Sequence, residues 1–274
     1  MGLVILVTGA SSGLGRAAAV RLAAAGHRVY GTSRKAPAEH EHEGASENEP
    51  RMLQMDVDDD DSVAVGVDVL LAHAGRIDVV LNNAGISVVG SLEDTTMAEV
   101  RRQFETNLFG LIRVTRAVLP TMRAQAGGKI INVSSLAGML PLPFQGYYSA
   151  SKFAVEGFTR SLRMEVRPFG VQACTIAPGD FRTEMTANRI YAAAGDSQAY
   201  GAQMRKTVTG YEADEASGAD PSEFAALVEK LVGKRKLKPR YLCGPLMQQL
   251  GVPVERLLGP RLFEPIMRDH CKIE

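Results

Sequence analysis

A glycine-rich turn between an apolar run and a helical pattern constrains the fold of this chain most strongly. Leu3–Val7 is continuously apolar, Thr8–Gly15 contains three glycines, and Gly13–Ala25 has the spacing of a helix. A turn in this context joins a buried parallel strand to a helix whose first N–H groups can bind an anion. The sequence therefore predicts a strand, a phosphate-binding turn and a helix in immediate succession.

Each glycine of the turn has its own role in this interpretation. Gly9 permits the tight turn, Gly13 lets the backbone approach a pyrophosphate, and Gly15 allows the helix to pack closely. A strand–helix turn that binds no ligand is the alternative. The residues predicted to contact the pyrophosphate are Gly9, Ser11, Ser12, Gly13, Leu14 and Gly15.

Short apolar runs recur along the chain and alternate with helix-length segments. They lie at Leu3–Val7, Arg28–Gly31, Met52–Met55, Asp78–Leu81, Lys129–Val133, Val171–Ala177 and Arg240–Cys243. Strands that are apolar throughout suit a parallel sheet covered by helices on both faces. We therefore expect an α/β fold with a Rossmann-type doubly wound parallel sheet of about seven strands, in three α/β/α layers. A chain of 274 residues fits one such domain, spanning residues 1–274.

Four segments show other patterns. Met97–Arg123 and Tyr147–Arg167 have helical spacing, so we expect two long helices. Residues 36–50 are acidic and without period, which indicates a solvated loop. Residues 180–220 are weakly periodic, and such a segment in a compact domain is more often a lid or substrate-binding segment than a connector.

Composition excludes several classes of function. Basic and acidic residues number 31 each, so no field attracts nucleic acid, and no run of about 18 apolar residues predicts a membrane span. Cys174, Cys243 and Cys271 form no CxxC pair, and His40 and His42 lie in the predicted loop, where no rigid backbone fixes ligand geometry. We expect no metal site and a reducing, cytoplasmic location.

Tyr148 and Lys152 are candidates for acid–base chemistry. They are four residues apart in a helical segment, so both side chains lie on one face. A phenol has an ordinary pKa of about 10, and a nearby ammonium is expected to lower it by favouring the phenolate. Tyr148 could then act as a general acid or base, whereas Tyr147 has Ser151 at the same spacing and no lysine.

A serine follows the predicted strand that ends near Val133. Ser135 precedes Tyr148 by 13 residues, and its hydroxyl could donate to a carbonyl oxygen that gains negative charge. Ser134 is the alternative, one residue earlier and on the opposite face of an extended chain. We favour Ser135.

Together these motifs resemble the short-chain dehydrogenase/reductase family. The turn has the spacing Gly-x-x-x-Gly-x-Gly, and Asn82-Asn83-Ala84-Gly85, Ser135, Tyr148-x-x-x-Lys152 and Pro178-Gly179 follow in the family's order. The resemblance covers nearly the whole chain and is closest to the 17β-hydroxysteroid and retinol dehydrogenase-like branch. It implies a nicotinamide-dependent oxidoreductase that assembles as a homodimer or homotetramer through the two long helices.

The resemblance also implies roles for individual residues. Asn107 matches the asparagine that holds a water between the lysine and solvent, and Asp56 matches the residue that contacts adenine. The implied catalytic tetrad is Asn107, Ser135, Tyr148 and Lys152. Besides the turn, the implied cofactor contacts are Ser33, Arg34, Asp56, Val57, Asn83, Ala84, Gly85, Tyr148, Lys152, Pro178, Gly179 and Thr183.

The end of the second strand favours NADP(H) over NAD(H). An acid at this position would bond the ribose hydroxyls and repel a 2′-phosphate, but the residue here is Ser33. Arg34 follows, and a guanidinium can pair with a phosphate. The alternative is that Arg34 and Lys35 only begin a solvated loop.

The sequence predicts an apolar substrate. Leu136–Phe144 follows Ser135 and is mostly apolar, so we expect a pocket for an apolar ketone or secondary alcohol, steroid-like or retinoid-like, although any one of these residues could be ordinary core. A non-catalytic NADP(H)-binding sensor or scaffold is the competing interpretation. A structural oligomerisation protein would explain the long helices but not the tetrad.

Overall fold

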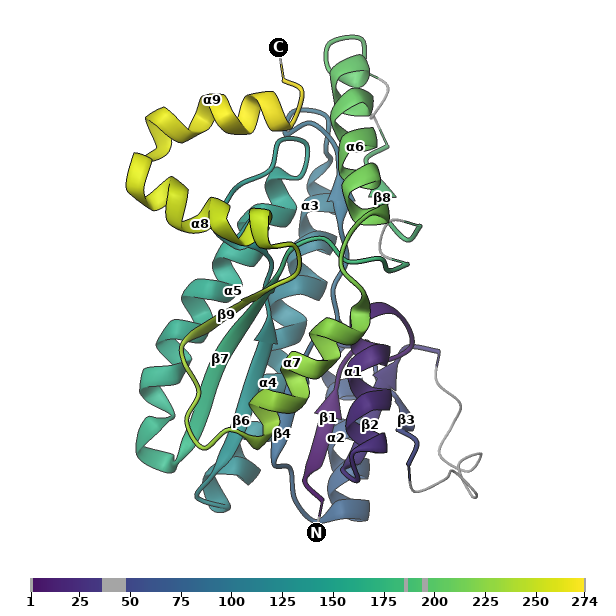
Figure 1. Ribbon diagram of the computed structural model, residues 1–274. Helices are drawn as coiled ribbons and strands as arrows, with labels where there is room; N and C mark the ends of the chain where they lie inside the picture. The colour runs from purple at the N-terminus through teal and green to yellow at the C-terminus, as the bar shows by residue number, and fades with distance from the viewer. Residues whose placement is uncertain (1, 36–47, 185–186, 194–196, 274) are drawn as a thin grey trace.

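A seven-stranded parallel sheet forms the middle layer of the computed structural model, which describes residues 2–35, 48–184, 187–193 and 197–273 (Figure 1). The strand order is β3-β2-β1-β4-β6-β7-β9. These strands are β1 (Val4–Val7), β2 (Arg28–Ser33), β3 (Arg51–Gln54), β4 (Val79–Asn82), β6 (Gly128–Val133), β7 (Val171–Pro178) and β9 (Arg240–Cys243). The order reverses next to β1, which confirms the predicted doubly wound sheet.

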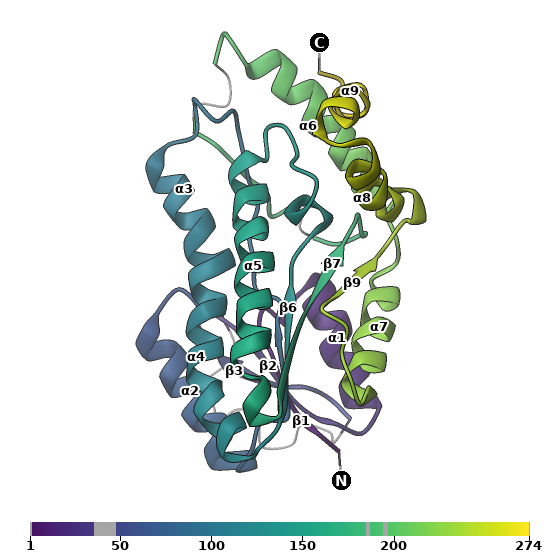
Figure 2. The same ribbon diagram turned by 90° about the vertical axis from the view of Figure 1, so that its left-hand side faces the viewer.

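Helices cover both faces of the sheet (Figure 2). One face carries α1 (Gly13–Ala24) and α7 (Pro221–Gly233), and the other carries α2 (Asp60–Ala74), α4 (Leu111–Ala124) and α5 (Gly146–Glu165). Alternate residues of β1 supply the two cores: Ile5 packs with Phe224 of α7, whereas Leu6 belongs to the cluster of Val114. All four residues of β1 are buried, as expected for a strand between two helical layers.

The predicted helix over residues 97–123 is interrupted. It consists of α3 (Met97–Phe104), a π-helical segment (Glu105–Gly110) and α4. Contacts with the chain after β3 hold this segment: Thr106 donates to the Asp58 carboxylate over 2.8 Å, and a Cβ on Gly110 would lie 2.8 Å from Val57 Cγ2. π-Helical segments often mark functional sites, and this one contains Asn107.

Further elements gather at the carboxyl ends of the strands (Figures 1 and 2). They are the paired strands β5 (Val88–Val89) and β8 (Ile190–Tyr191), and the helices α6 (Gly201–Ala216), α8 (Leu246–Leu258) and α9 (Pro260–His270). The weakly periodic segment 180–220 thus contains a helix of 16 residues. Of the predicted loop 36–50, residues 36–47, with His40 and His42, lie outside the described part. Ligands of open parallel sheets bind at this edge.

The described residues contain neither a membrane-spanning helix nor a cluster of metal ligands. None of their helices has both the length and the apolar character that crossing a membrane requires. No group of three or more His, Cys, Asp or Glu side chains in that part of the chain could hold a metal ion.

Candidate active site

Tyr148 and Lys152 lie one turn apart near the start of α5, and both side chains are buried. The Lys152 ammonium is 5.7 Å from the centroid of the Tyr148 ring. It donates a hydrogen bond of 3.0 Å to the carbonyl of Val133, the last residue of β6. The helix and the sheet edge therefore fix the lysine together.

Ser135 faces Tyr148 from the end of β6. It caps a short 3-10 turn (Leu136–Gly138), where its hydroxyl accepts from Ala137 N over 3.1 Å, and it hydrogen-bonds the Tyr148 hydroxyl. Ser134 differs, because its hydroxyl lies 3.5 Å from the backbone carbonyl of Lys152. Ser135 is thus the serine whose hydroxyl meets the phenol.

Asn107 connects the π-helical segment to the rest of the site. Its Oδ1 accepts from Ile86 N over 2.8 Å, and its Nδ2 donates to Ile86 O and to Ser151 Oγ over 3.0 and 3.2 Å. A Cβ on Gly85 would lie 3.3 Å from Asn107 Oδ1 and 3.7 Å from Lys152 Nζ. The fold therefore brings the four predicted tetrad residues to one place.

The electrostatics of this cluster correct one expectation. Burial raises the pKa of Tyr148 to about 12, although the hydrogen bond from Ser135 opposes the shift. Burial also lowers the pKa of Lys152 to about 8. The expectation of a phenol pKa lowered by the ammonium is wrong for this form, because burial dominates and Lys152 is not among the groups that lower the pKa of Tyr148. Tyr148 is consequently a neutral hydroxyl, able to donate a proton, at pH 7.

Asn83, which follows β4, holds the glycine turn by hydrogen bonds. Its Nδ2 donates to Thr8 O and Gly9 O over 3.0 and 3.1 Å. Gly9 has a φ of 64°, and a Cβ there would lie 2.9 Å from Ala84 Cα. A Cβ on Gly15 would lie 2.3 Å from Asn83 Nδ2 and from Gly9 O. No side chain larger than hydrogen fits at either glycine without a shift.

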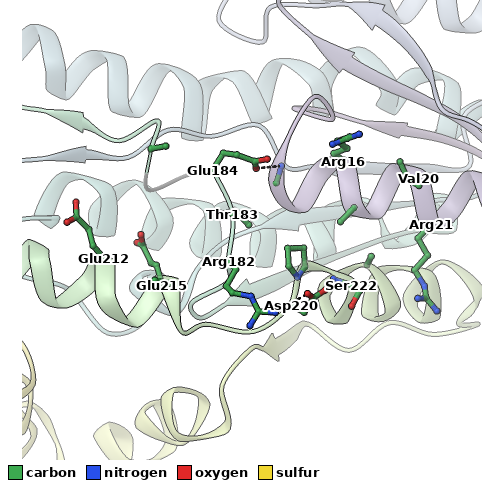
Figure 3. Close-up of a pocket in the computed structure, with 16 residues that line it drawn as sticks. Arg16, Val20, Arg21, Arg182, Thr183, Glu184, Glu212, Glu215, Asp220 and Ser222 are labelled. Atoms are coloured by element: carbon green, nitrogen blue, oxygen red, sulfur yellow. Dashed lines mark hydrogen bonds and ion pairs between the residues drawn. The ribbon is translucent and has the colours of Figure 1, made fainter.

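The start of α1 already holds an anionic group. Gly13 N–H donates over 2.9 Å to the carboxylate of Glu184 (Figure 3). Thr183 lies beside it, since a Cβ on Gly13 would be 3.4 Å from Thr183 Cβ. A cavity of about 940 Å³ opens here between α1, α7 and the 182–184 segment. The contact shows that this N–H can donate to an oxyanion, as binding a pyrophosphate requires. A bound pyrophosphate would take the place of the Glu184 carboxylate.

A second cavity, of about 570 Å³, lies at the end of β2. Ser11, Arg16, Ser33 and Lys35 line it, and Lys35 N donates to Ser33 Oγ over 3.2 Å. Arg34 does not line this cavity, and its charge acts instead on Asp58. Sequence reasoning missed Arg16 and Lys35. The available signal was that both are bases adjacent to predicted cofactor contacts.

The remaining predicted contacts also lie at the carboxyl edge of the sheet. Asp56 follows β3 and accepts from Asp58 N over 3.1 Å, and Val57 is buried behind Gly110. Gly179 follows β7, where a Cβ would lie 3.1 Å from Leu136 Cδ1. The two ends of a dinucleotide would therefore meet strands on opposite sides of β1.

The doubly wound sheet, the glycine turn and the tyrosine–lysine pair define a Rossmann-type oxidoreductase. A family model described as short chain dehydrogenase matches residues 3–193. The chain belongs to this family, and its members interconvert CH–OH and C=O groups.

The chain is similar in sequence to named relatives over almost its whole length. It is 43% identical over 266 residues to a 3-ketodihydrosphingosine reductase from Bacteroides thetaiotaomicron, covering 97% of this chain and 96% of that protein. It is 34% identical over 280 residues to dehydrogenase/reductase SDR family member 7B from Bos taurus, covering 99% and 82%.

Solved structures have the same fold. A short-chain dehydrogenase from Streptomyces avermitilis matches with a TM-score of 0.84 and 33% identity, over 98% of both chains. A short-chain dehydrogenase/reductase from Burkholderia phymatum, in complex with NAD, matches with a TM-score of 0.75 and 25% identity over 88% of both chains.

Proposed function

We propose that this protein uses NADPH to reduce the ketone of a long-chain lipid, with 3-ketodihydrosphingosine as the model substrate. The observation that carries this proposal is the buried Tyr148 hydroxyl, which hydrogen-bonds Ser135 and lies beside the Lys152 ammonium. A group that stays protonated at pH 7 is suited to deliver a proton to a developing alkoxide. The 43% identity to a 3-ketodihydrosphingosine reductase supports the substrate class.

The preference for NADPH rests on the cavity at the end of β2. Ser33 brings no carboxylate to this cavity, and Arg16 and Lys35 bring two cationic side chains to its lining, against the single carboxylate of Glu49. The side chains of the lining therefore carry a net positive charge, and the two basic groups and the Ser33 hydroxyl would favour a ribose 2′-phosphate placed there. The turn and Thr183 would hold the pyrophosphate and the nicotinamide end.

Bound NADPH would supply the hydride that reduces the carbonyl carbon. Ser135 would donate a hydrogen bond to the carbonyl oxygen, and Tyr148 would transfer its proton to that oxygen, so that the ketone becomes a secondary alcohol. The Lys152 cation would stabilise the phenolate that remains and favour its reprotonation. Asn107 donates to Ile86 O and to Ser151 Oγ, so it ties the chain at Ile86 to α5. Ser151 immediately precedes Lys152, and through this contact Asn107 would position the lysine.

The sequence predicts that the apolar segment after Ser135 lines the substrate pocket, but several of its side chains pack within the protein. Leu136 and Leu140 pack against Val252 of α8 and Phe263 of α9, so they help to hold the two C-terminal helices over the site. Phe144 packs on a separate cluster with Met204. Pairing of subunits through α4 and α5 stays a prediction, as does the cytoplasmic location.

The test begins with a titration of the purified protein with NADPH and with NADH, followed by nicotinamide fluorescence. NADPH oxidation is then measured with 3-ketodihydrosphingosine in mixed micelles, and the alcohol is identified by mass spectrometry. Tighter binding of NADPH and a product two hydrogens heavier are expected. Tighter binding of NADH would refute the cofactor preference. Binding of NADPH without turnover of any long-chain ketone would refute the reductase and favour a nucleotide-binding sensor or scaffold.

A further inference from the structure

Asp180 reaches the site from the strand beside the one that leads to Ser135. It follows Pro178 and Gly179 at the end of β7, which pairs with β6 up to Val133 and Ile176. Asp180 is partly buried, and its negative charge contributes to the raised pKa of Tyr148. Its neighbour Gly179 lies against the residue that follows Ser135, because a Cβ on Gly179 would be 3.1 Å from Leu136 Cδ1, so Asp180 lies beside the strand end that carries Ser135.

Helix α8 fixes the orientation of this carboxylate. Gln248 donates from Nε2 to Asp180 Oδ2 over 2.5 Å, and Asp180 N donates to Gln248 Oε1 over 2.9 Å. Within the described part of the chain, Asp180 Oδ1 has no hydrogen-bond partner. One carboxylate oxygen is thus held by the protein, and the other can accept a hydrogen bond from a ligand.

The charges around Asp180 come from α6 and α9. Glu215 is paired with Arg189, and Asp214 lies 3.7 Å from His270. Asp180 has no cation within ion-pair distance among the described residues, although Glu215, Asp214 and His270 all act on it. Burial, together with the two acids, raises its pKa to about 6, although the hydrogen bond from Gln248 and the charge of His270 oppose this shift.

We propose that Asp180 binds a protonated amine on the carbon next to the substrate carbonyl, so that the enzyme selects α-amino ketones over plain ketones. This inference rests on the proposed reductase function and names the recognition element of its substrate. With the carbonyl oxygen on Ser135 and Tyr148, an amine on the adjacent carbon that extends from β6 toward the neighbouring strand β7 would meet the Asp180 carboxylate. A charge-assisted hydrogen bond between ammonium and carboxylate is stronger than a neutral one.

The pair of ligands that tests this differs only in the amine. Initial rates of NADPH oxidation are compared for 3-ketodihydrosphingosine and for 1-hydroxyoctadecan-3-one, its analogue without the amine, in the same micelles. The wild type should prefer the amine by about 10- to 100-fold in kcat/KM. In Asp180→Asn, an amide oxygen still accepts from Gln248, but the charge is lost. This variant should lose the preference, mainly through a higher KM for the amine.

Asp214→Asn is the matched control, since it removes a neighbouring negative charge that already faces His270. It should keep the preference within about threefold. Binding of NADPH to each variant, followed by fluorescence, shows that the fold is intact. If Asp180→Asn does not fold, the wild type is compared on 3-ketodihydrosphingosine and its N-acetyl derivative, which should be the poorer substrate by about tenfold or more.

The outcomes separate the two proposals. Equal turnover of both ketones by the wild type overturns the amine subsite and leaves the reductase standing. Equal losses on both ketones in Asp180→Asn also overturn the subsite, because they show a structural role. Turnover of neither ketone by the wild type overturns the reductase, and the subsite with it.

Discussion

Replacing Lys152 with methionine should stabilise the fold while it destroys activity. Burial lowers the pKa of Lys152 from 10.5 to about 8, a difference of about 3 kcal/mol at 1.36 kcal/mol per unit. Methionine carries no charge and fills similar space. It leaves the Val133 carbonyl without its 3.0 Å donor, which costs about 1 kcal/mol. The variant should therefore be more stable than the wild type by about 2 kcal/mol at pH 7.

The pH dependence of this difference follows from proton counting. Between the folded pKa of about 8 and the ordinary value of 10.5, the unfolded chain holds the proton that the folded chain has released. Wild-type stability therefore rises with pH across this window, as far as Lys152 is concerned. Lys152→Met lacks that rise. Its advantage should be full below pH 8 and should become a deficit of about 1 kcal/mol, that of the lost hydrogen bond, above pH 10.5.

The assay is urea unfolding of the nucleotide-free proteins at equal concentration, at pH 7 and at pH 10.5, with NADPH oxidation measured in parallel. Lys236→Met, at an exposed position, is the control and should change stability by less than about 0.5 kcal/mol. A Lys152→Met variant that is less stable than the wild type at pH 7, or a gap that does not shrink with pH, would refute the reasoning.

Three further substitutions test other parts of the site and core. Ser33→Asp should reverse the preference from NADPH to NADH by restoring an acid beside the ribose, and unchanged Kd values for both nucleotides would contradict the cofactor argument. Gly15→Ala should abolish NADPH binding, since its Cβ would lie 2.3 Å from Asn83 Nδ2; fluorescence titration checks this, with Gly210→Ala, in α6 with open space around its Cβ, as the tolerant control. Phe224→Ala should cost about 3–5 kcal/mol of unfolding free energy, because the side chain is 0% exposed between α7 and the sheet, and a loss below about 1 kcal/mol would show that the cavity collapses.

The parts of the structure that the sequence predicts are those with a strong local signal. Strands such as Val4–Val7 and Arg240–Cys243 are bounded by turn residues, so their positions agree with the predictions to within one residue or so. The turn with Gly9 and Gly15 could be predicted because neither position has room for a Cβ, so only glycine fits there. The four tetrad residues meet because Tyr148 and Lys152 share one face of α5, Ser135 follows β6, and the π-helical segment carries Asn107 to the same place.

The parts that sequence reasoning missed depend on contacts between distant segments. The π-helical segment at Asn107 is held by Val57 and Asp58, about fifty residues away, and helical spacing alone cannot show it. The raised pKa of Tyr148 follows from burial by several elements rather than from its spacing to Lys152. Arg16 reaches the β2 cavity only because α1 packs beside it.

The central claim is that Tyr148 delivers the proton in an NADPH-dependent ketone reduction. Tyr148→Phe removes the hydroxyl that Ser135 contacts and keeps the ring, so the measurement is kcat/KM for 3-ketodihydrosphingosine beside the Kd for NADPH. We expect kcat/KM to fall by about 10²- to 10⁴-fold while the Kd changes by less than about threefold. Turnover within tenfold of the wild type, with binding intact, would contradict the assignment of Tyr148 as the proton donor.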